Sequence, residues 1–457
     1  MIQRMTTSIF LLFSLFIVRG QSLESEYSFT LEEAIDFALE NSYQSINARR
    51  DVAKAIKQKW ETTAMGLPQI NGGVDYQNQL KQPVTFIPAN AFDPNASGDE
   101  LIPVVFSPEQ SMAATATLSQ LIFDGSYLVA LQAAKTFLQF SDNALEKTQL
   151  EVRKGVINAY GSVLLTNETI SIFEKNVKNL QKNLDETIQI FKNGLTEEES
   201  VEQLQITLAQ IKNQLENTKR LQSIAYQMFN LAIGLDVQNE VTLLDDLTSL
   251  ALQNTSKQLV EQQLDITNNV DYKIALNLTE QRELELKQQK SFALPSLTGF
   301  INYGANAAGN EFNFFSDAEW FESSILGVSL QIPLFSSGMR SAQTARAKIA
   351  LEQAKTDFDQ TQQEIQLALD SARSNYLFAV QNLETVQNNL SLAERIENKN
   401  QIKFTEGLST SFELRQAQTQ LYDSQQEVLQ AMVDLINYKA DLETILSIPQ
   451  INVSNQN

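Results

Sequence analysis

Proline is distributed unevenly along this chain of 457 residues. The nine prolines stand at positions 68, 83, 88, 94, 103, 108, 295, 333 and 449, so residues 109–294 and 334–448 contain none. Proline interrupts an α-helix because it has no backbone N–H to donate and its ring collides with the preceding turn. The two proline-free stretches can therefore form very long helices, whereas the five prolines within 83–108 predict a long irregular loop.

The chain also repeats itself. LPQINGGVDY at 67–76 matches LPSLTGFINY at 294–303, LSQLIFDG at 118–125 matches LQIPLFSSG at 330–338, and FKNGL at 191–195 matches FTEGL at 404–408. Three matches in the same order indicate an internal duplication. We therefore predict two repeats, residues 21–245 and 246–457, of which the first carries about 15 additional residues between its first two matching segments.

Apolar side chains recur at alternating spacings of three and four within the proline-free stretches. In the second repeat this series includes Leu369, Ala372, Tyr376, Ala379 and Leu383. The pattern is typical of helices that pack as a coiled coil or a bundle. We predict long helices over about 126–190 and 339–404, and return helices over about 198–233, 256–292, 410–446 and 31–66.

The repeated Phe-x-x-Gly-Leu phrase falls where each long helix gives way to a return helix. Glycine commonly ends a helix because it adopts the left-handed conformation without a steric penalty. Gly194 with Leu195, and Gly407 with Leu408, are therefore predicted to form two turns, near 191–197 and 404–410, at one end of a helical rod.

Four other segments alternate between apolar and polar residues, and we predict strands over about 69–80, 110–122, 296–304 and 323–334. In the last of these, Leu326, Val328 and Leu330 alternate with Gly327 and Ser329. Such strands suit a membrane β-barrel, but the pattern also fits a soluble, half-buried sheet. Single-chain barrels have at least eight strands, so four strands would have to be shared among several copies to close in lipid.

Five aromatic residues stand near the last predicted strand: Phe312, Phe314, Phe315, Trp320 and Phe321. They suit an aromatic girdle at a membrane interface, where such rings gather. They equally suit the internal packing of the loop between two strands. The sequence alone does not choose between these two interpretations.

The composition narrows the classes of function. There is no cysteine and no histidine, and the formal net charge is −21. Disulfides, thiol catalysis and histidine chemistry are therefore excluded, and no motif of a serine or lysine hydrolase is present. We predict a protein that is not an enzyme and that binds no metal or cofactor. The acidic balance argues against a nucleic-acid partner, which requires a basic surface.

The first 20 residues are typical of a secretion signal peptide. Arg4 supplies the positive charge, Ser8–Val18 forms the apolar segment, and cleavage is expected after Gly20. The apolar segment is too short to span a bilayer, which requires about 20 residues. We therefore expect an exported protein.

The duplicated segments, together with FTLEEAIDFALENS at 29–42 and FTEGLSTSFELRQAQTQL at 404–421, resemble the TolC-like outer-membrane efflux proteins. The resemblance covers nearly all of the chain beyond the signal. It implies an α+β membrane protein: a homotrimer that shares one 12-stranded β-barrel in lipid of the outer membrane, with coiled-coil hairpins that form a tunnel in the periplasm. The implied partners are a periplasmic membrane-fusion adaptor and an inner-membrane transporter.

The function implied by the resemblance is export of small molecules, such as drugs and toxic compounds, through a tripartite efflux pump. Type I secretion, with peptides or proteins as cargo, is the related role. From the residues alone, a secreted coiled-coil structural or adhesive protein with a small β-domain is the alternative from a different class. Recovery in the outer-membrane fraction would separate the two.

The resemblance also implies a periplasmic gate, because acidic side chains after the turn glycine narrow the tunnel in such proteins. Glu413, six residues past Gly407, matches this position by type, and Gln416 stands at the next pore position, where the family often has Asp. The first repeat has Ser200 at the position equivalent to Glu413, after Glu197–Glu199. On the residues alone, Glu413 also fits an ordinary solvated carboxylate, and the three glutamates fit a helix start.

Overall fold

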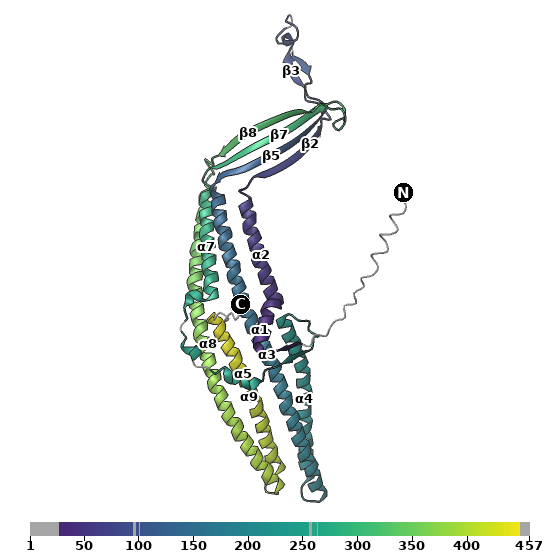
Figure 1. Cartoon of the computed structure of the whole chain (residues 1–457), viewed down its shortest axis with the longest axis vertical. Helices are drawn as coiled ribbons and strands as arrows, with labels where there is room; N and C mark the ends of the chain where they lie inside the picture. Colours follow the sequence, from purple (N-terminus) through teal and green to yellow (C-terminus); the bar gives the residue numbers. More distant parts are fainter. Residues whose placement is uncertain (1–26, 95–96, 100, 256–257, 263, 448–457) are drawn as a thin grey trace, which may run out of the picture. The chain divides into compact units, whose positions relative to one another are not determined.

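The computed structural model describes residues 27–94, 97–99, 101–255, 258–262 and 264–447 (Figure 1). The predicted secretion signal lies outside these residues. The chain divides into two compact units. Among the described residues, the first unit contains 27–46, 148–264 and 368–447, and the second contains 47–147 and 265–367. Each unit thus combines parts of both predicted repeats, and the boundary between the repeats at residue 245 stays a prediction.

The first unit consists mainly of helices. It contains α1 (Leu31–Asn41), α4 (Glu198–Ile233), α5 (Leu247–Gln253), α6 (Gln258–Glu261), α9 (Ser411–Ile445), and parts of α3 (Gly125–Lys192) and α8 (Met339–Thr405). A small parallel sheet joins β1 (Tyr27–Phe29) to β6 (Val241–Leu243). The predicted helices at 126–190, 198–233, 339–404 and 410–446 are confirmed to within two residues.

The predicted heptad series forms the core of this unit. Leu369, Tyr376 and Leu383 are buried in one cluster with residues of α3, α4 and α9. A second cluster lies along the α3–α4 hairpin, where Leu180 and Leu204 are almost completely buried. Burial of these side chains, at about 1.5–3 kcal/mol each, holds the helices together more strongly than their intrinsic helix propensity does.

A buried polar network joins α3 to the small sheet. Tyr160 is completely buried, and its hydroxyl lies 2.9 Å from Asp245 Oδ2 and 3.1 Å from the carbonyl oxygen of Phe29. Asp245 Oδ2 also accepts a 2.7 Å hydrogen bond from the backbone N–H of Leu31. Burial and the neighbouring Asp245 raise the pKa of Tyr160, so its hydroxyl remains a donor. The network fixes the start of α1 against the middle of α3.

The second unit contains the main sheet. Its strands are β2 (Gln69–Asn78), β5 (Gln110–Asp124), β7 (Ser296–Gly309) and β8 (Phe321–Gln331). They pair in the order β2-β5-β7-β8, and every pair is antiparallel. β2 and β8 are therefore the two open edges. The unit also contains α2 (Tyr43–Ala64, from residue 47), η2 (Ile266–Asn268), α7 (Val270–Ser291) and the remaining parts of α3 and α8.

The strand register separates an apolar face of the sheet from a polar one. One cross-strand row contains Ile70, Leu118, Ile301 and Leu326. The next row, on the opposite face, contains Asn71, Thr117, Asn302 and Ile325. The apolar row is not a buried core, because Ile70 is 73% exposed and Leu326 is 80% exposed. Among the described helices, none is both long and apolar enough to cross a membrane.

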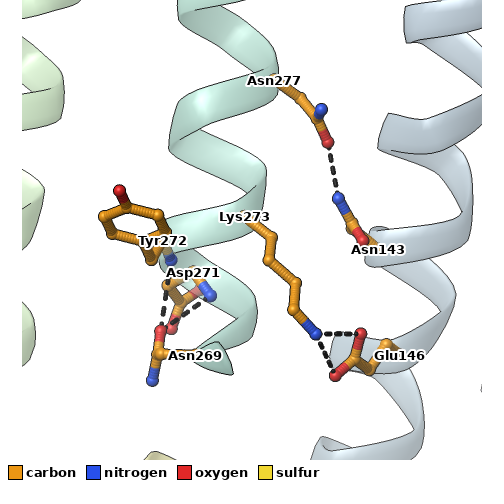
Figure 2. Close-up of polar contacts among 7 residues, drawn as sticks. All are labelled: Asn143, Glu146, Asn269, Asp271, Tyr272, Lys273 and Asn277. Carbon is orange, nitrogen blue, oxygen red and sulfur yellow. Dashed lines mark hydrogen bonds and ion pairs between the residues drawn. The ribbon is translucent and has the colours of Figure 1, made fainter. Parts of the chain in front are cut away.

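Polar contacts fix the beginning of α7 against α3, as Figure 2 shows. Lys273 Nζ lies 2.9 Å from both carboxylate oxygens of Glu146. The Asn143 side chain donates to Asn277 Oδ1. Asn277 lies one helical turn beyond Lys273 on α7. Asn269 caps the helix by accepting from the backbone N–H of Asp271. These bonds set the position at which α7 begins.

Two of the predicted return helices are interrupted. The prediction of one helix over 256–292 is wrong for its first part, because α7 begins only at Val270. Asp265 caps the short helix η2, and Asn269 caps α7. Side chains of this kind bond to nearby backbone N–H groups and so favour a new helix start over one continuous helix. The helix predicted over 31–66 is divided at Ser42, which is extended and whose Oγ accepts from the N–H of Ser45.

The prediction of an irregular loop over 83–108 is wrong in part, because this segment contains regular structure. Residues Thr85–Pro88 form β3, which pairs antiparallel with β4 (Leu101–Val104), and Ala89–Ala91 form the short helix η1. The strands at 69–80, 110–122, 296–304 and 323–334 are confirmed, with ends displaced by up to five residues.

Two of the aromatic residues near β8 support the loop-packing interpretation left open by the sequence. Phe314 is buried against Met112 and Ala307, and Trp320 Nε1 donates to the carbonyl oxygen of Phe314. These two rings pack the loop. Phe315 remains 82% exposed.

Candidate functional site

The two repeated Phe-x-x-Gly-Leu phrases form matching helix ends. Gly194 and Gly407 have φ angles of +71° and +74°. The N–H of Leu195 donates to the carbonyl oxygen of Ile190, and the N–H of Leu408 donates to the carbonyl oxygen of Lys403. This is the Schellman arrangement, in which a left-handed glycine lets the chain satisfy the last carbonyls of a helix. The predicted turns are therefore confirmed, and we call residues 190–200 and 403–416 the tip region.

Leu195 and Leu408 follow the glycines and point into solvent. Their exposed fractions are 78% and 73%. A leucine after a Schellman glycine usually contacts the preceding helical turn, but here most of each side chain is uncovered. Two exposed leucines at equivalent positions therefore form an apolar feature of the tip region.

Glu413 completes a capping box at the start of α9. Its Oε2 accepts from the N–H of Thr410 at 2.9 Å and from Ser409 Oγ at 2.7 Å, and its own N–H donates to Thr410 Oγ1. The hydrogen bonds from Thr410 and Ser409 lower the pKa of Glu413, which keeps the carboxylate charged. The S/T-x-x-E spacing of Thr410 and Glu413 is a sequence signal for this role.

The two tips are joined by a hydrogen bond that the sequence analysis did not predict. Ser411 Oγ donates to Ser200 Oγ at 3.0 Å. Ser200 stands at the position of the first repeat that is equivalent to Glu413. Glu197 is the N-cap residue of α4, and Glu198 and Glu199 lie in its first turn. This placement suits the dipole of the helix N-terminus.

Further polar pairs connect the two hairpins within the first unit. The side-chain amides of Asn183 on α3 and Gln401 on α8 exchange two hydrogen bonds of 3.0 and 3.2 Å. Asn176 on α3 donates to Gln425 on α9 at 3.0 Å. Buried amides of this kind fix the alignment of packed helices.

A groove of about 1020 Å³ lies between α4, α8 and α9 and extends into the tip region. Its apolar lining residues are exposed, namely Ile206, Leu392, Ile396 and Phe412, and its other lining residues are polar or charged. Arg415 lies over the ring of Phe412 at 5.3 Å and also lines the groove. Gln416, the second predicted gate residue, lies here as well, whereas the carboxylate of Glu413 is bonded to its own turn.

A partly buried carboxylate lies in the helical hairpin behind the tip. Burial raises the pKa of Glu397, and a hydrogen bond with Gln418 offsets part of that effect. Ionisation of Glu397 therefore lowers the free energy of unfolding. The loss begins as the pH rises above the ordinary glutamate pKa and is complete once the pH exceeds the higher pKa of the folded state.

We expect Glu397→Gln to raise the melting temperature at pH 7 to 8, because the amide removes the buried charge but can still bond to Gln418. The gain should shrink as the pH falls toward the ordinary glutamate pKa. Thermal unfolding of both proteins across this range tests the prediction. A gain that is constant with pH would mean that the charge of Glu397 is not responsible.

Among the residues that the structure describes, no three acidic side chains gather so as to hold a metal ion. That the protein uses no cofactor stays a prediction.

Comparison with known proteins assigns the family. A sequence model described as outer membrane efflux protein matches residues 34–235 and 275–447, which is most of the chain. The chain belongs to the outer membrane efflux protein family. The resemblance drawn from the repeated segments is thereby confirmed, and so is the outer-membrane location, with the helical part in the periplasm.

Individual relatives agree with this assignment. The outer membrane protein TolC of Vibrio cholerae is 23% identical over 342 residues, which cover 72% of this chain and 76% of that protein. Among solved structures, CusC superposes with a TM-score of 0.71 at 16% identity, covering 91% of each chain. The outer membrane protein VceC of Vibrio cholerae gives 0.69 at 15% identity, covering 91% of this chain and 96% of VceC.

At these identities the solved structures show the fold, and they confirm the predicted combination of long helical hairpins with four strands per chain. The family assignment argues against the alternative that the sequence left open, a secreted coiled-coil structural or adhesive protein. That the protein catalyses no reaction stays a prediction.

Proposed function

We propose that this outer membrane efflux protein is one subunit of a homotrimeric conduit that exports small molecules, with peptides or proteins as a further class of cargo. The main support is the exposed apolar face of a sheet whose edges, β2 and β8, are both open. Backbone groups at an open edge cannot remain unpaired in lipid. Pairing β2 of one copy with β8 of the next satisfies both edges, and three copies give a 12-stranded barrel.

The native mass of the protein, extracted in mild detergent from outer membranes, tests this assembly. We expect the mass of three chains after correction for bound detergent. A single chain, or a soluble protein, would contradict the shared barrel. Two or four chains would retain a closed barrel but correct the subunit count.

The tip region is the proposed docking site for a periplasmic adaptor, through which an inner-membrane transporter supplies the cargo. Leu195 and Leu408 offer exposed apolar contacts at the ends of both hairpins. The groove that contains Phe412 and Arg415 combines exposed apolar side chains with polar and charged ones, which suits an amphipathic helix. Both features lie in the same compact unit.

Glu413 is the proposed gate residue. Three copies of its carboxylate around a narrow axis would attract cations and repel anions. We expect Glu413→Gln to reduce the cation selectivity of single channels in planar bilayers, because glutamine can keep the capping box while the charge is lost. Gln416 lines the groove as a neutral side chain, so we assign it no charge-based role.

The matched control is Thr410→Ala, which breaks the capping box but retains the charge of Glu413. Selectivity that falls in Thr410→Ala and not in Glu413→Gln would show that helix capping, rather than charge at the axis, controls the channel.

A further inference from the structure

The β3–β4 hairpin exposes a continuous apolar face. In the antiparallel register, Phe86 pairs with Pro103 and Pro88 pairs with Leu101. Directly paired residues share a face of the hairpin, so all four side chains lie on one side. None is polar, and Phe86 and Leu101 are 62% and 56% exposed.

Isolated two-stranded hairpins are at most marginally stable in water. Their apolar surface is stabilised when a third element covers it. Here more apolar surface flanks the hairpin, since Leu80, Val84, Phe92, Val105 and Phe106 are also exposed. A concentration of this kind marks an interaction surface rather than ordinary scatter of single apolar residues.

The attachment of the hairpin limits what can cover it. The hairpin belongs to the second compact unit and lies beyond the end of the sheet at which β2 ends (Figure 1). Only six residues, 79–84, connect β2 to β3, and they span at most roughly 20 Å. Hydrogen bonds from Gln79 N to Glu109 O and from Gln82 Nε2 to Ser107 O hold the two connecting segments together.

We propose that a second copy of this chain covers the apolar face of the hairpin, at the junction where β2 of one copy pairs with β8 of the next. This inference rests on the proposed shared barrel, because that pairing brings the start of the neighbouring β8 beside the end of β2. The neighbouring copy presents exposed aromatic surface at this end: Phe321 is the first residue of β8, and Phe315 lies in the preceding loop. The hairpin thus adds an intersubunit contact at the end of the barrel that lies away from the periplasmic helices.

Photo-crosslinking in intact cells tests this contact in the full-length protein. We replace Phe86 or Leu101 with benzoylphenylalanine, irradiate, and separate the products on denaturing gels. The expected product is a covalent dimer of this chain. Thr85, which is also exposed but points to the other face of β3, is the control and should give at least about threefold less dimer.

A crosslink to another protein, a crosslink to lipid or lipopolysaccharide, or equal dimer yield from position 85 would overturn the proposal. Native mass in mild detergent is measured for each variant. An intact oligomer without covalent dimer would reject only the hairpin contact. A single chain would reject the shared barrel as well.

A second variant gives an independent readout. Phe86→Ser combined with Leu101→Ser should weaken association between copies by at least about tenfold, because two apolar side chains lose their buried surface. The measurement is the fraction of oligomer that survives a heating series in mild detergent. Survival equal to that of the unchanged protein would show that the hairpin makes no stabilising contact with a second copy.

Discussion

Replacing Gly234 with alanine is expected to destabilise the first unit by about 2–5 kcal/mol. Gly234 ends α4 with a φ of +90°, a conformation that costs energy for a residue with a side chain. A Cβ atom at this position would lie 2.3 Å from the carbonyl oxygen of Asn41 and 2.9 Å from Cα of Ser42. Both neighbours are backbone atoms, so a side-chain rotation cannot relieve the collision.

Gly194 and Gly407 supply matched controls for this prediction. They have similar positive φ angles, yet an added Cβ would meet nothing within 4 Å at either position. Gly194→Ala and Gly407→Ala should therefore cost only the conformational penalty, about 1–2 kcal/mol. Thermal and urea unfolding in the same detergent compare the three variants. Equal losses would mean that backbone strain, and not the approach of Asn41, dominates at Gly234.

The long helices could be predicted because their signals are local and repeated. The absence of proline permits helix over 109–294, and the heptad series containing Leu369 and Tyr376 identifies the buried face. The turn glycines were predictable for the same reason, since glycine is the residue that adopts a positive φ without strain. The duplication then supplied each of these signals twice.

The middle of the molecule was less predictable because its contacts join residues far apart in sequence. Tyr160 bonds to Asp245 and to the carbonyl oxygen of Phe29, and no local pattern indicates those partners. The interruption before α7 did have a local signal, namely the capping residues Asp265 and Asn269. The capping role of Glu413 was readable from its spacing to Thr410, but the hydrogen bond between Ser200 and Ser411 was not.

Leu326→Arg is expected to prevent stable insertion into the outer membrane. Leu326 lies near the middle of β8, in the exposed apolar row with Ile70, Leu118 and Ile301. If this face contacts lipid, an arginine at mid-depth costs about 2–4 kcal/mol in each copy, and a shared barrel of three copies incurs that cost three times. The amount of folded oligomer in the outer-membrane fraction should therefore fall strongly.

The neighbouring substitution Ile325→Arg is the control that decides the orientation of the sheet. Ile325 lies in the polar row, where the Asn302 amide already donates to Thr117 Oγ1 at 2.7 Å. An arginine there would face the lumen, where water can solvate it, so oligomer levels should stay close to those of the unchanged protein. The two positions are adjacent in the same strand, so their backbone environments are matched.

Loss of oligomer from Ile325→Arg alone would reverse the assignment of the lipid face. Equal tolerance of both substitutions would contradict a lipid-exposed barrel, since only a sheet with water on both faces accepts a charge on either one.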